Sequence, residues 1–96
     1  MMKQISNVRF TATPEAESSF HDDRVVIFHT GKGSLFSSNR TSAQIWRGVE
    51  QKLSVDLIAQ QISGEYQIEL TTAREHTFGF LTELHQHALV QREVLS

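Results

Sequence analysis

Five histidines are the residues of this sequence best suited to bind a metal ion, but their spacing does not form a site. They are His21, His29, His76, His85 and His87. His85 and His87 are two residues apart, so their side chains would point in different directions on a helix. The chain has no cysteine, and no acidic residue completes a recognised zinc spacing with the histidines. We therefore expect no metal and no cofactor.

Hydroxyl and lysine side chains likewise lack the neighbours that catalysis needs. The serines do not lie in the Gly-x-Ser-x-Gly pattern of a nucleophile elbow. Gly31-Lys32-Gly33 contains two glycines and a lysine, but without the spacing of a phosphate-binding loop. Because the pattern assembles no nucleophile with a base and an orienting group, we expect that the protein is not an enzyme.

The composition indicates one compact domain. The chain has 96 residues, 39% of them hydrophobic, which suffices for one core. The formal net charge is −2, so no basic surplus favours nucleic acid or an anionic membrane. Met1–Asn7 lacks the apolar run of a signal peptide, and the longest apolar run, Val25–Phe28, is far too short to span a membrane. The absence of cysteine rules out disulfides and fits a reducing compartment. We therefore expect a cytoplasmic protein with a single domain over residues 1–96.

The part of the chain before residue 39 has the pattern of strands and turns. Val8–Ala12 alternates apolar and polar residues, as a half-buried strand does. Residues 15–23 are mostly polar, so we expect a loop there. Arg24–Thr30 is rich in β-branched and aromatic residues and predicts a second strand. Thr30–Gly33 is a glycine-containing hairpin turn, after which Ser34–Ser37 returns as a short third strand.

After residue 39 the pattern becomes helical. Asn39 and Ser54 are expected to cap two successive helices, because their side chains accept hydrogen bonds from free backbone N–H groups. The apolar stripe of the first helix consists of Ala43, Trp46, Val49 and Leu53. The stripe of the second helix consists of Val55, Ile58, Ala59 and Ile62. We expect Gly64 to end the second helix, since glycine is a common C-terminal stop.

A third helix and a short extended piece complete the chain. Thr72–Glu75 has the pattern of a capping box and predicts the start of this helix. Its apolar stripe consists of Ala73, Thr77, Phe80, Leu81, Leu84 and Ala88. Leu89-Val90 is expected to be extended. A three-stranded antiparallel sheet followed by three helices is an α+β domain. The short connection between the last two helices, with the hairpin as a wing, predicts a winged helix-turn-helix.

An ordered set of short motifs resembles the PqqD-like family. The motifs are residues 33–46, Ser54–Ala59, Glu65-Tyr66, Phe80–Leu84 and Ala88–Val90. The resemblance as a whole covers about residues 23 to 92, and the order and spacing of the motifs are more specific than any single motif. The chain departs from the family pattern at Ser38, His76 and Ala88, where leucine, aspartate and glycine are usual.

The resemblance implies a winged helix-turn-helix fold that recognises peptides. Members of the family bind the leader region of a ribosomally synthesised precursor peptide and present its core to a separate modifying enzyme. That enzyme is a radical-SAM protein in pyrroloquinoline quinone synthesis and a leader peptidase or cyclase in lasso-peptide assembly. The resemblance leaves the choice between these partners open.

The third strand is the expected peptide-binding edge, because an edge strand has unpaired N–H and C=O groups with which a peptide can pair. The third helix would provide side-chain pockets beside it. The candidate residues are Ser34, Leu35, Phe36, Ser37 and Ser38 on the strand and Arg74, Phe78, Thr82 and His85 on the helix. Leu35 and Phe36 would point to opposite faces of a regular strand. Core packing of Phe78 and simple solvation of Arg74 stay open as alternatives to peptide contact.

Two other functions stay open, a DNA-binding regulator and a structural interaction subunit. Recognition helices bring Arg, Lys, Asn or Gln to base edges. Residues 71–88 contain one arginine, no lysine and two glutamates, so this helix would repel phosphates and we expect no nucleic-acid partner. A structural subunit would be indicated if no peptide bound the third strand. The free edge also leaves strand-mediated homodimerisation open.

Overall fold

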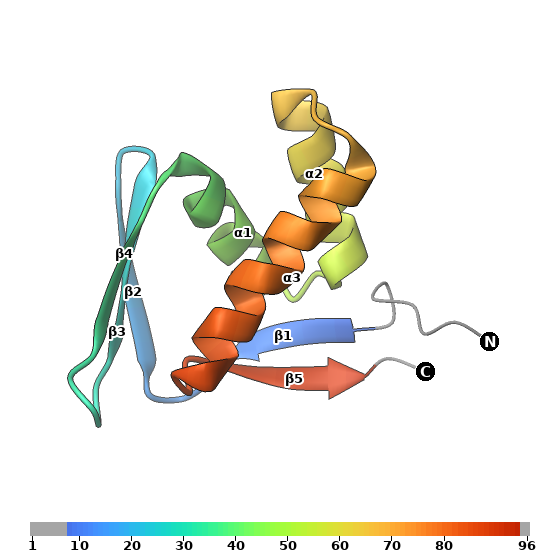
Figure 1. The fold of residues 1–96 in the computed structure, drawn as a ribbon. Coiled ribbons are helices and arrows are strands. Elements are labelled where there is room, and N and C mark those ends of the chain that lie inside the picture. Colours follow the sequence, from blue (N-terminus) through green and yellow to red (C-terminus); the bar gives the residue numbers. More distant parts are fainter. Residues whose placement is uncertain (1–7, 95–96) are drawn as a thin grey trace.

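The computed structural model describes residues 8–94, which form an α+β domain as predicted (Figure 1). Its strands are β1 (Val8–Ala12), β2 (Ala16–His21), β3 (Arg24–His29), β4 (Leu35–Ser38) and β5 (Val90–Val94). Its helices are α1 (Arg40–Glu50), α2 (Val55–Tyr66) and α3 (Leu70–Gln86). Met1–Asn7, where the sequence predicts no signal peptide, lies outside the described residues. No helix among the described residues is long and apolar enough to cross a membrane.

The strands form two antiparallel sheets, so the prediction of one sheet was wrong. β2, β3 and β4 form a three-stranded sheet in that order, with the helices on one of its faces (Figure 1). β1 is not part of this sheet and pairs with β5, from Val8↔Val94 to Ala12↔Val90. β1 contacts α1 and α2, and β5 contacts α3. The first and last strands of the described residues therefore pair with each other and pack against the helices.

The predicted loop at residues 15–23 was also wrong, because most of it is strand β2. The strand alternates half-buried and exposed residues, and Ala16, Ser18 and Phe20 are its half-buried set. The hydroxyl of Ser18 accepts a hydrogen bond of 2.9 Å from Nε1 of Trp46. A serine at an inward position is thus satisfied by a distant tryptophan, which no local apolar pattern announces.

The predicted hairpin between β3 and β4 is confirmed. Gly33 has a φ of 76°, a conformation that favours glycine, and its N–H donates to the carbonyl of His29 at 2.7 Å. The buried His29 stabilises the turn through its side chain, because Nδ1 accepts hydrogen bonds from the N–H groups of Gly31 and Lys32 at 3.1 and 3.0 Å. The third predicted strand, Ser34–Ser37, is found one residue later, at Leu35–Ser38.

Both predicted helix caps at the start of α1 and α2 are confirmed. Oδ1 of Asn39 accepts from the N–H of Ser42 at 2.9 Å, and Oγ of Ser54 accepts from the N–H of Leu57 at 3.2 Å. The predicted stop at Gly64 was wrong, because α2 continues to Tyr66 and ends at Gln67 with a φ of 55°. Gly64 is exposed within the helix, where nothing forces a turn.

The predicted capping box at Thr72–Glu75 was wrong as well. α3 begins at Leu70, and the N–H of Ala73 donates to the carbonyl of Glu69 at 2.9 Å. Glu69 is the N-cap residue and makes no side-chain capping bond. The α3 stripe is largely as predicted, with Ala73, Thr77, Leu81 and Leu84 buried. At the other end Ala88, with a φ of 62°, turns the chain into β5, which is longer than the expected Leu89-Val90.

The buried apolar residues of both sheets and all three helices form one core. They are Val8, Phe10, Val25, Ile27, Ala43, Ile45, Trp46, Val49, Val55, Ile58, Ala59, Ile62, Ala73, Leu81, Leu84, Leu89 and Val90. This core fixes α3 between the two sheets, and the position of α3 determines which strand edges have a helix beside them.

Candidate functional site

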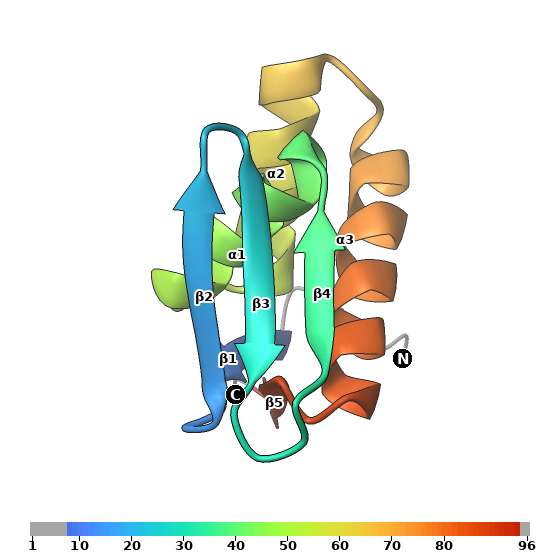
Figure 2. The same cartoon turned by 90° about the vertical axis from the view of Figure 1, so that its left-hand side faces the viewer.

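The free edge of β4 is on the side of the sheet toward α3 (Figure 2), and the ring of Phe36 on β4 contacts that of His87 at the C-terminal end of α3. Among residues 8–94, β4 pairs with β3 alone, in the register Phe28↔Leu35, Ile27↔Phe36 and Val26↔Ser37. Its other side therefore has backbone groups without a strand partner in the described part of the chain. The predicted edge strand is thus an edge in the structure.

The register determines which backbone groups of β4 point outward. The N–H of His29 donates to the carbonyl of Ser34 at 2.9 Å, so Ser34 directs its carbonyl to β3. Backbone groups alternate between the two sides of an antiparallel strand. Phe36 and Ser38 therefore also direct their N–H and C=O to β3, whereas Leu35 and Ser37 direct theirs to the free edge. The edge offers two donors and two acceptors to an added strand.

The side chains of β4 divide between the two faces of the sheet. Phe36 is half-buried on the inner face, where its ring packs edge-to-face against that of His87 with centroids 4.8 Å apart. Ser38 is half-buried on the same face, and its hydroxyl donates to the carbonyl of Val25 at 3.2 Å. Leu35 and Ser37 are exposed on the outer face. Oγ of Ser34 is buried without a hydrogen-bond partner among the described residues.

One flank of α3 faces β4, and the contact of Phe36 with His87 identifies it. Residues seven apart lie on the same side of a helix, which places Phe80 on the flank of His87. His76, four residues before Phe80, belongs to the same flank. Phe80 is half-buried against the core, and His76 and His87 are exposed. This flank therefore combines an aromatic ring with two imidazoles, of which His87 contacts the edge strand through Phe36.

The predicted residues of α3 lie on the opposite flank. Nε of Arg74 donates to Oδ1 of Asp56 in α2 at 2.7 Å. The rings of Phe78 and His85 pack edge-to-face on Phe10 of β1, with centroids 6.1 and 6.2 Å apart. The helical period places Thr82 on the same flank. The structure thus brings the five strand residues together but does not bring these four helix residues to them. Peptide contact by Arg74, Phe78, Thr82 and His85 stays a prediction.

Sequence reasoning missed Phe80 and His87 as site residues. Phe80 belongs to the apolar stripe of α3 and was assigned to the core, although it lies at the edge of that stripe. His87 follows the helix and has no motif around it. The only signal in the sequence was the position of Phe80 at the edge of the apolar stripe of α3. That position does not show on which flank of α3 the strand β4 lies.

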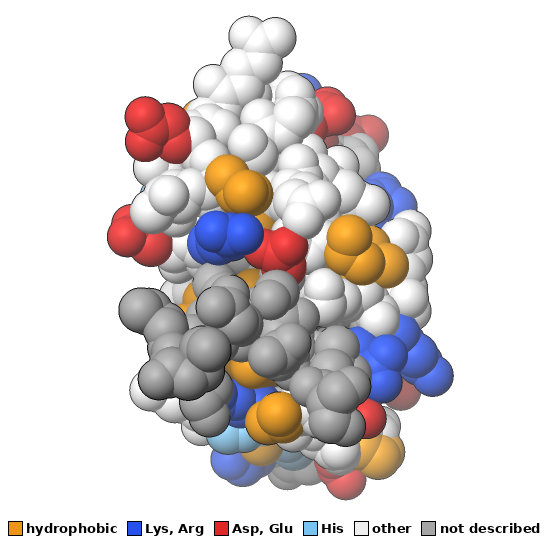
Figure 3. Space-filling view, turned by 90° about the vertical axis from the view of Figure 1, so that its right-hand side faces the viewer, with side chains coloured by type: hydrophobic (Ala, Val, Ile, Leu, Met, Phe, Trp, Pro, Cys, Tyr) orange, Lys and Arg blue, Asp and Glu red, His pale blue; other side chains and the backbone are white. Residues whose placement is uncertain are grey.

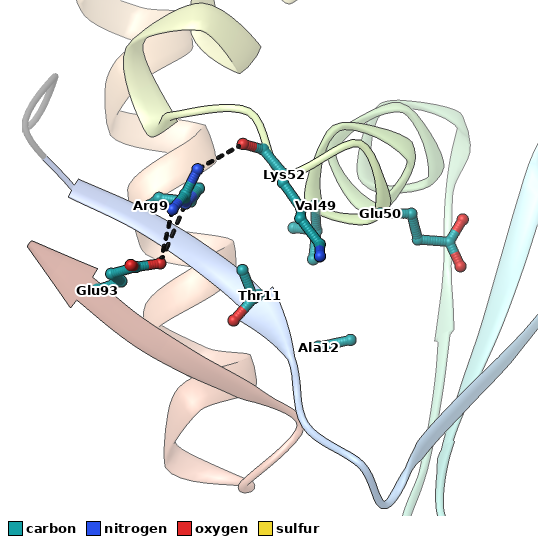
Figure 4. A pocket seen from close by; sticks show the side chains of 7 residues that line it. All are labelled: Arg9, Thr11, Ala12, Val49, Glu50, Lys52 and Glu93. Atoms are coloured by element: carbon teal, nitrogen blue, oxygen red, sulfur yellow. Dashed lines mark hydrogen bonds and ion pairs between the residues drawn. The ribbon is translucent and has the colours of Figure 1, made fainter. Parts of the chain in front are cut away.

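A hollow of about 530 Å³ lies between β1 and the end of α1, and two of the charged residues that line it, Arg9 and Glu93, pair with each other (Figure 4). Arg9 donates to Oε1 of Glu93 at 2.9 and 3.1 Å and to the carbonyl of Lys52 at 3.4 Å.

The face of the molecule on the right of Figure 1 shows apolar side chains in separate spots between charged ones, outside its grey atoms (Figure 3). Among residues 8–94, no three His, Asp or Glu side chains converge as metal ligands. The β4 edge is the better candidate.

Known proteins match this chain in sequence and in fold. The family model described as coenzyme PQQ synthesis protein D (PqqD) matches residues 24–90. The solved structure "TbiB1 in Complex with the TbiA(beta) Leader Peptide" has a TM-score of 0.80 and 25% identity, covering 84% of this chain and 94% of that one. "Lasso peptide synthetase B1 complexed with the leader peptide" has a TM-score of 0.78 and 24% identity, covering 85% and 96%. No curated protein matches the sequence.

Proposed function

We propose that this protein binds the leader region of a ribosomally synthesised precursor peptide. The chain belongs to the PqqD family, as its sequence motifs predict. The observation that carries the proposal is the free edge of β4 beside α3, which lies within the matched residues 24–90. The two similar structures, both described as complexes with a leader peptide, support it.

The leader pairs with β4 as an added strand. It exchanges backbone hydrogen bonds with Leu35 and Ser37, whose N–H and C=O groups point to the free edge. Each such bond contributes about 0.5–1.5 kcal/mol net, so four of them give a useful affinity with little dependence on sequence. Side chains of the leader that point inward lie between Phe36 and the α3 flank of Phe80 and His87. These inward side chains supply selectivity.

The protein acts as a carrier and not as a catalyst. It presents the bound precursor to a separate modifying enzyme, either a radical-SAM protein or a leader peptidase of the lasso type.

The fold suits this task as a winged helix-turn-helix, with α2 and α3 as the helix pair and the β3–β4 hairpin as the wing. A cytoplasmic chain would meet precursors as they are made. A second copy would compete with the leader for the edge of β4, so homodimerisation and leader binding would exclude each other there.

The test is titration calorimetry with synthetic leader peptides, taken from candidate precursor reading frames that a search of the neighbouring genes identifies. We expect saturable binding of one peptide per chain and an unchanged peptide mass after long incubation. A peptide that gives no heat, together with duplex DNA that binds in a salt-dependent manner, would support the regulator instead. Cleavage or modification of the peptide by pure protein would contradict the carrier role.

A further inference from the structure

Within residues 8–94, no layer covers one face of the three-stranded sheet. The helices lie on the other face, so the outer face is open to solvent (Figures 1 and 2). The alternation along each strand identifies its outward residues. They are Glu17, Ser19 and His21 on β2, Arg24, Val26 and Phe28 on β3, and Leu35 and Ser37 on β4.

The apolar residues of this face gather toward the free edge. Phe28 and Leu35 are direct cross-strand partners, with 37% and 61% of their surfaces exposed. Val26, next to Phe28 on the same face, is half-buried and lines a hollow of about 200 Å³ with Phe28. Exposed leucine and phenylalanine side chains side by side leave apolar surface in water. The stripe therefore runs from β3 to Leu35 on the edge strand itself.

A strand added to β4 must place one of its side chains beside Leu35. Leu35 directs its N–H and C=O to the free edge, so an antiparallel partner residue stands directly opposite. The Cβ atoms of such a pair lie about 4.5–5.5 Å apart on the same face. The structure therefore bears on whether the side chain of that partner residue is apolar or polar. This step rests on the proposed function, because it assumes that a leader occupies the edge.

We propose that Leu35 selects an apolar side chain in the leader, at the residue that pairs opposite to it. An apolar partner covers Leu35 and extends the stripe by one strand, whereas a polar partner leaves both side chains in water. The next outward position of the leader stands opposite Ser37, where the neighbour is polar and no such selection acts. The leader thus has one selected apolar residue on the outer face, in addition to those that face α3.

The leader is a better occupant of this stripe than an enzyme surface that docks on the face alone. Leu35 is the most exposed member of the stripe, and it lies in the strand that also offers the free backbone groups. Any occupant of the edge covers Leu35 first. A protein that docked on the face alone would leave the edge unpaired and would have to tolerate the polar rim of Glu17, His21 and Arg24.

A double-mutant cycle tests the selection. Each residue of the synthetic leader is replaced in turn by serine, and affinities are measured for the parent, for Leu35→Thr and for the control Leu57→Thr. Leu57 is 49% exposed on α2, so the control changes the same residue type away from β4. We expect one leader position whose serine weakens binding about 2- to 5-fold in the parent and in Leu57→Thr, but not in Leu35→Thr.

The outcomes separate this inference from the proposed function. If the leader binds and every leader position is additive with Leu35→Thr, the selection is wrong although the carrier role stands. The selection is also wrong if Leu35→Thr leaves the scan unchanged and instead lowers enzyme turnover or the sedimentation coefficient, since the stripe then serves the enzyme or a second copy. If the leader does not bind the parent, the proposed function fails first. Melting curves verify that each variant is folded.

Discussion

Two free strand edges lie beside α3, one on each flank, and they differ in side chains more than in backbone. β4 and β5 each pair with one strand among residues 8–94. On β5 the carbonyl of Leu89 accepts from the N–H of Thr13 at 3.1 Å, so the alternation directs the backbone groups of Arg92 outward. Both edges therefore offer unpaired donors and acceptors, and the backbone alone would let a peptide join either one.

The side chains distinguish the two edges. From Leu35 to Ser38 β4 has no charged residue, whereas β5 contains Arg92 and Glu93. Glu93 forms an ion pair of 2.9 Å with Arg9, and Arg92 lies over the ring of Phe78 at 5.8 Å. Charged side chains on an edge strand oppose pairing with another chain. An open edge therefore becomes a peptide site only where its neighbours allow a strand to approach.

The largest expected effect comes from a substitution in the core, on whose packing both edges depend. Trp46 is 1% exposed, and its Nε1 bonds to Ser18 of β2. Trp46→Ala should lower the free energy of unfolding by about 3–5 kcal/mol, because it empties a large core site. Chemical denaturation measures this change, and Trp46→Phe is the milder control. A variant that melted like the parent but lost the leader would make Trp46 a binding platform instead.

A pair of phenylalanine variants separates the two flanks of α3. Phe80→Ala, on the β4 flank, should weaken leader binding by at least about 1 kcal/mol, as a central interface residue does. Phe78→Ala, on the β5 flank, should lower stability by about 1–3 kcal/mol through lost packing on Phe10, and leave affinity unchanged. Calorimetry and melting are measured on both.

The reverse result of the phenylalanine pair is equally informative. If Phe78→Ala weakens binding and Phe80→Ala does not, the leader contacts the flank that the sequence predicts. That flank includes Arg74, Thr82 and His85, and the β5 edge would then be the peptide site. The comparison between the edges would be reversed.

A pair of proline variants compares the edges directly. Proline has no N–H, so Ser37→Pro removes an outward donor of β4 and Arg92→Pro removes one of β5. Ser37→Pro should weaken leader binding by about 0.5–1.5 kcal/mol for the lost bond, whereas Arg92→Pro should not. Phe36→Pro should instead destabilise the sheet, since its N–H points to β3. Equal binding by folded Ser37→Pro and parent would exclude strand addition at this edge.

Local signals made much of the fold predictable from the sequence. Asn39 and Ser54 cap their helices through bonds to residues three positions away, and Gly33 determines the hairpin that precedes β4. The predicted edge strand followed from that hairpin. Each of these features depends on a few neighbouring residues, which a single sequence displays.

The missed features depend on residues that are far apart in the chain. β1 joins β5 across the whole domain, as the pair Val8↔Val94 shows, and nothing near Val8 announces that partner. Residues 15–23 were predicted to be a loop because they are mostly polar, whereas in β2 the inward Ser18 bonds to Trp46, 28 positions away. The predicted helix residues lie on the flank of α3 away from Phe36, because a helical period displays both flanks and does not show on which side a strand will lie.

The smallest expected effect concerns the ion pair on the β5 flank of α3. Arg74 and Asp56 are 2.7 Å apart, and their side chains are 39% and 14% exposed, so solvent screens the pair. Arg74→Gln should therefore cost less than about 1 kcal/mol of stability, and the cost should shrink further in 1 M salt. Affinity for the leader should not change, because Asp56 and not a peptide carboxylate accepts from this guanidinium. A clear loss of affinity, restored by neutralising one acidic residue of the leader, would show that the leader reaches this flank and would weaken the distinction between the two edges.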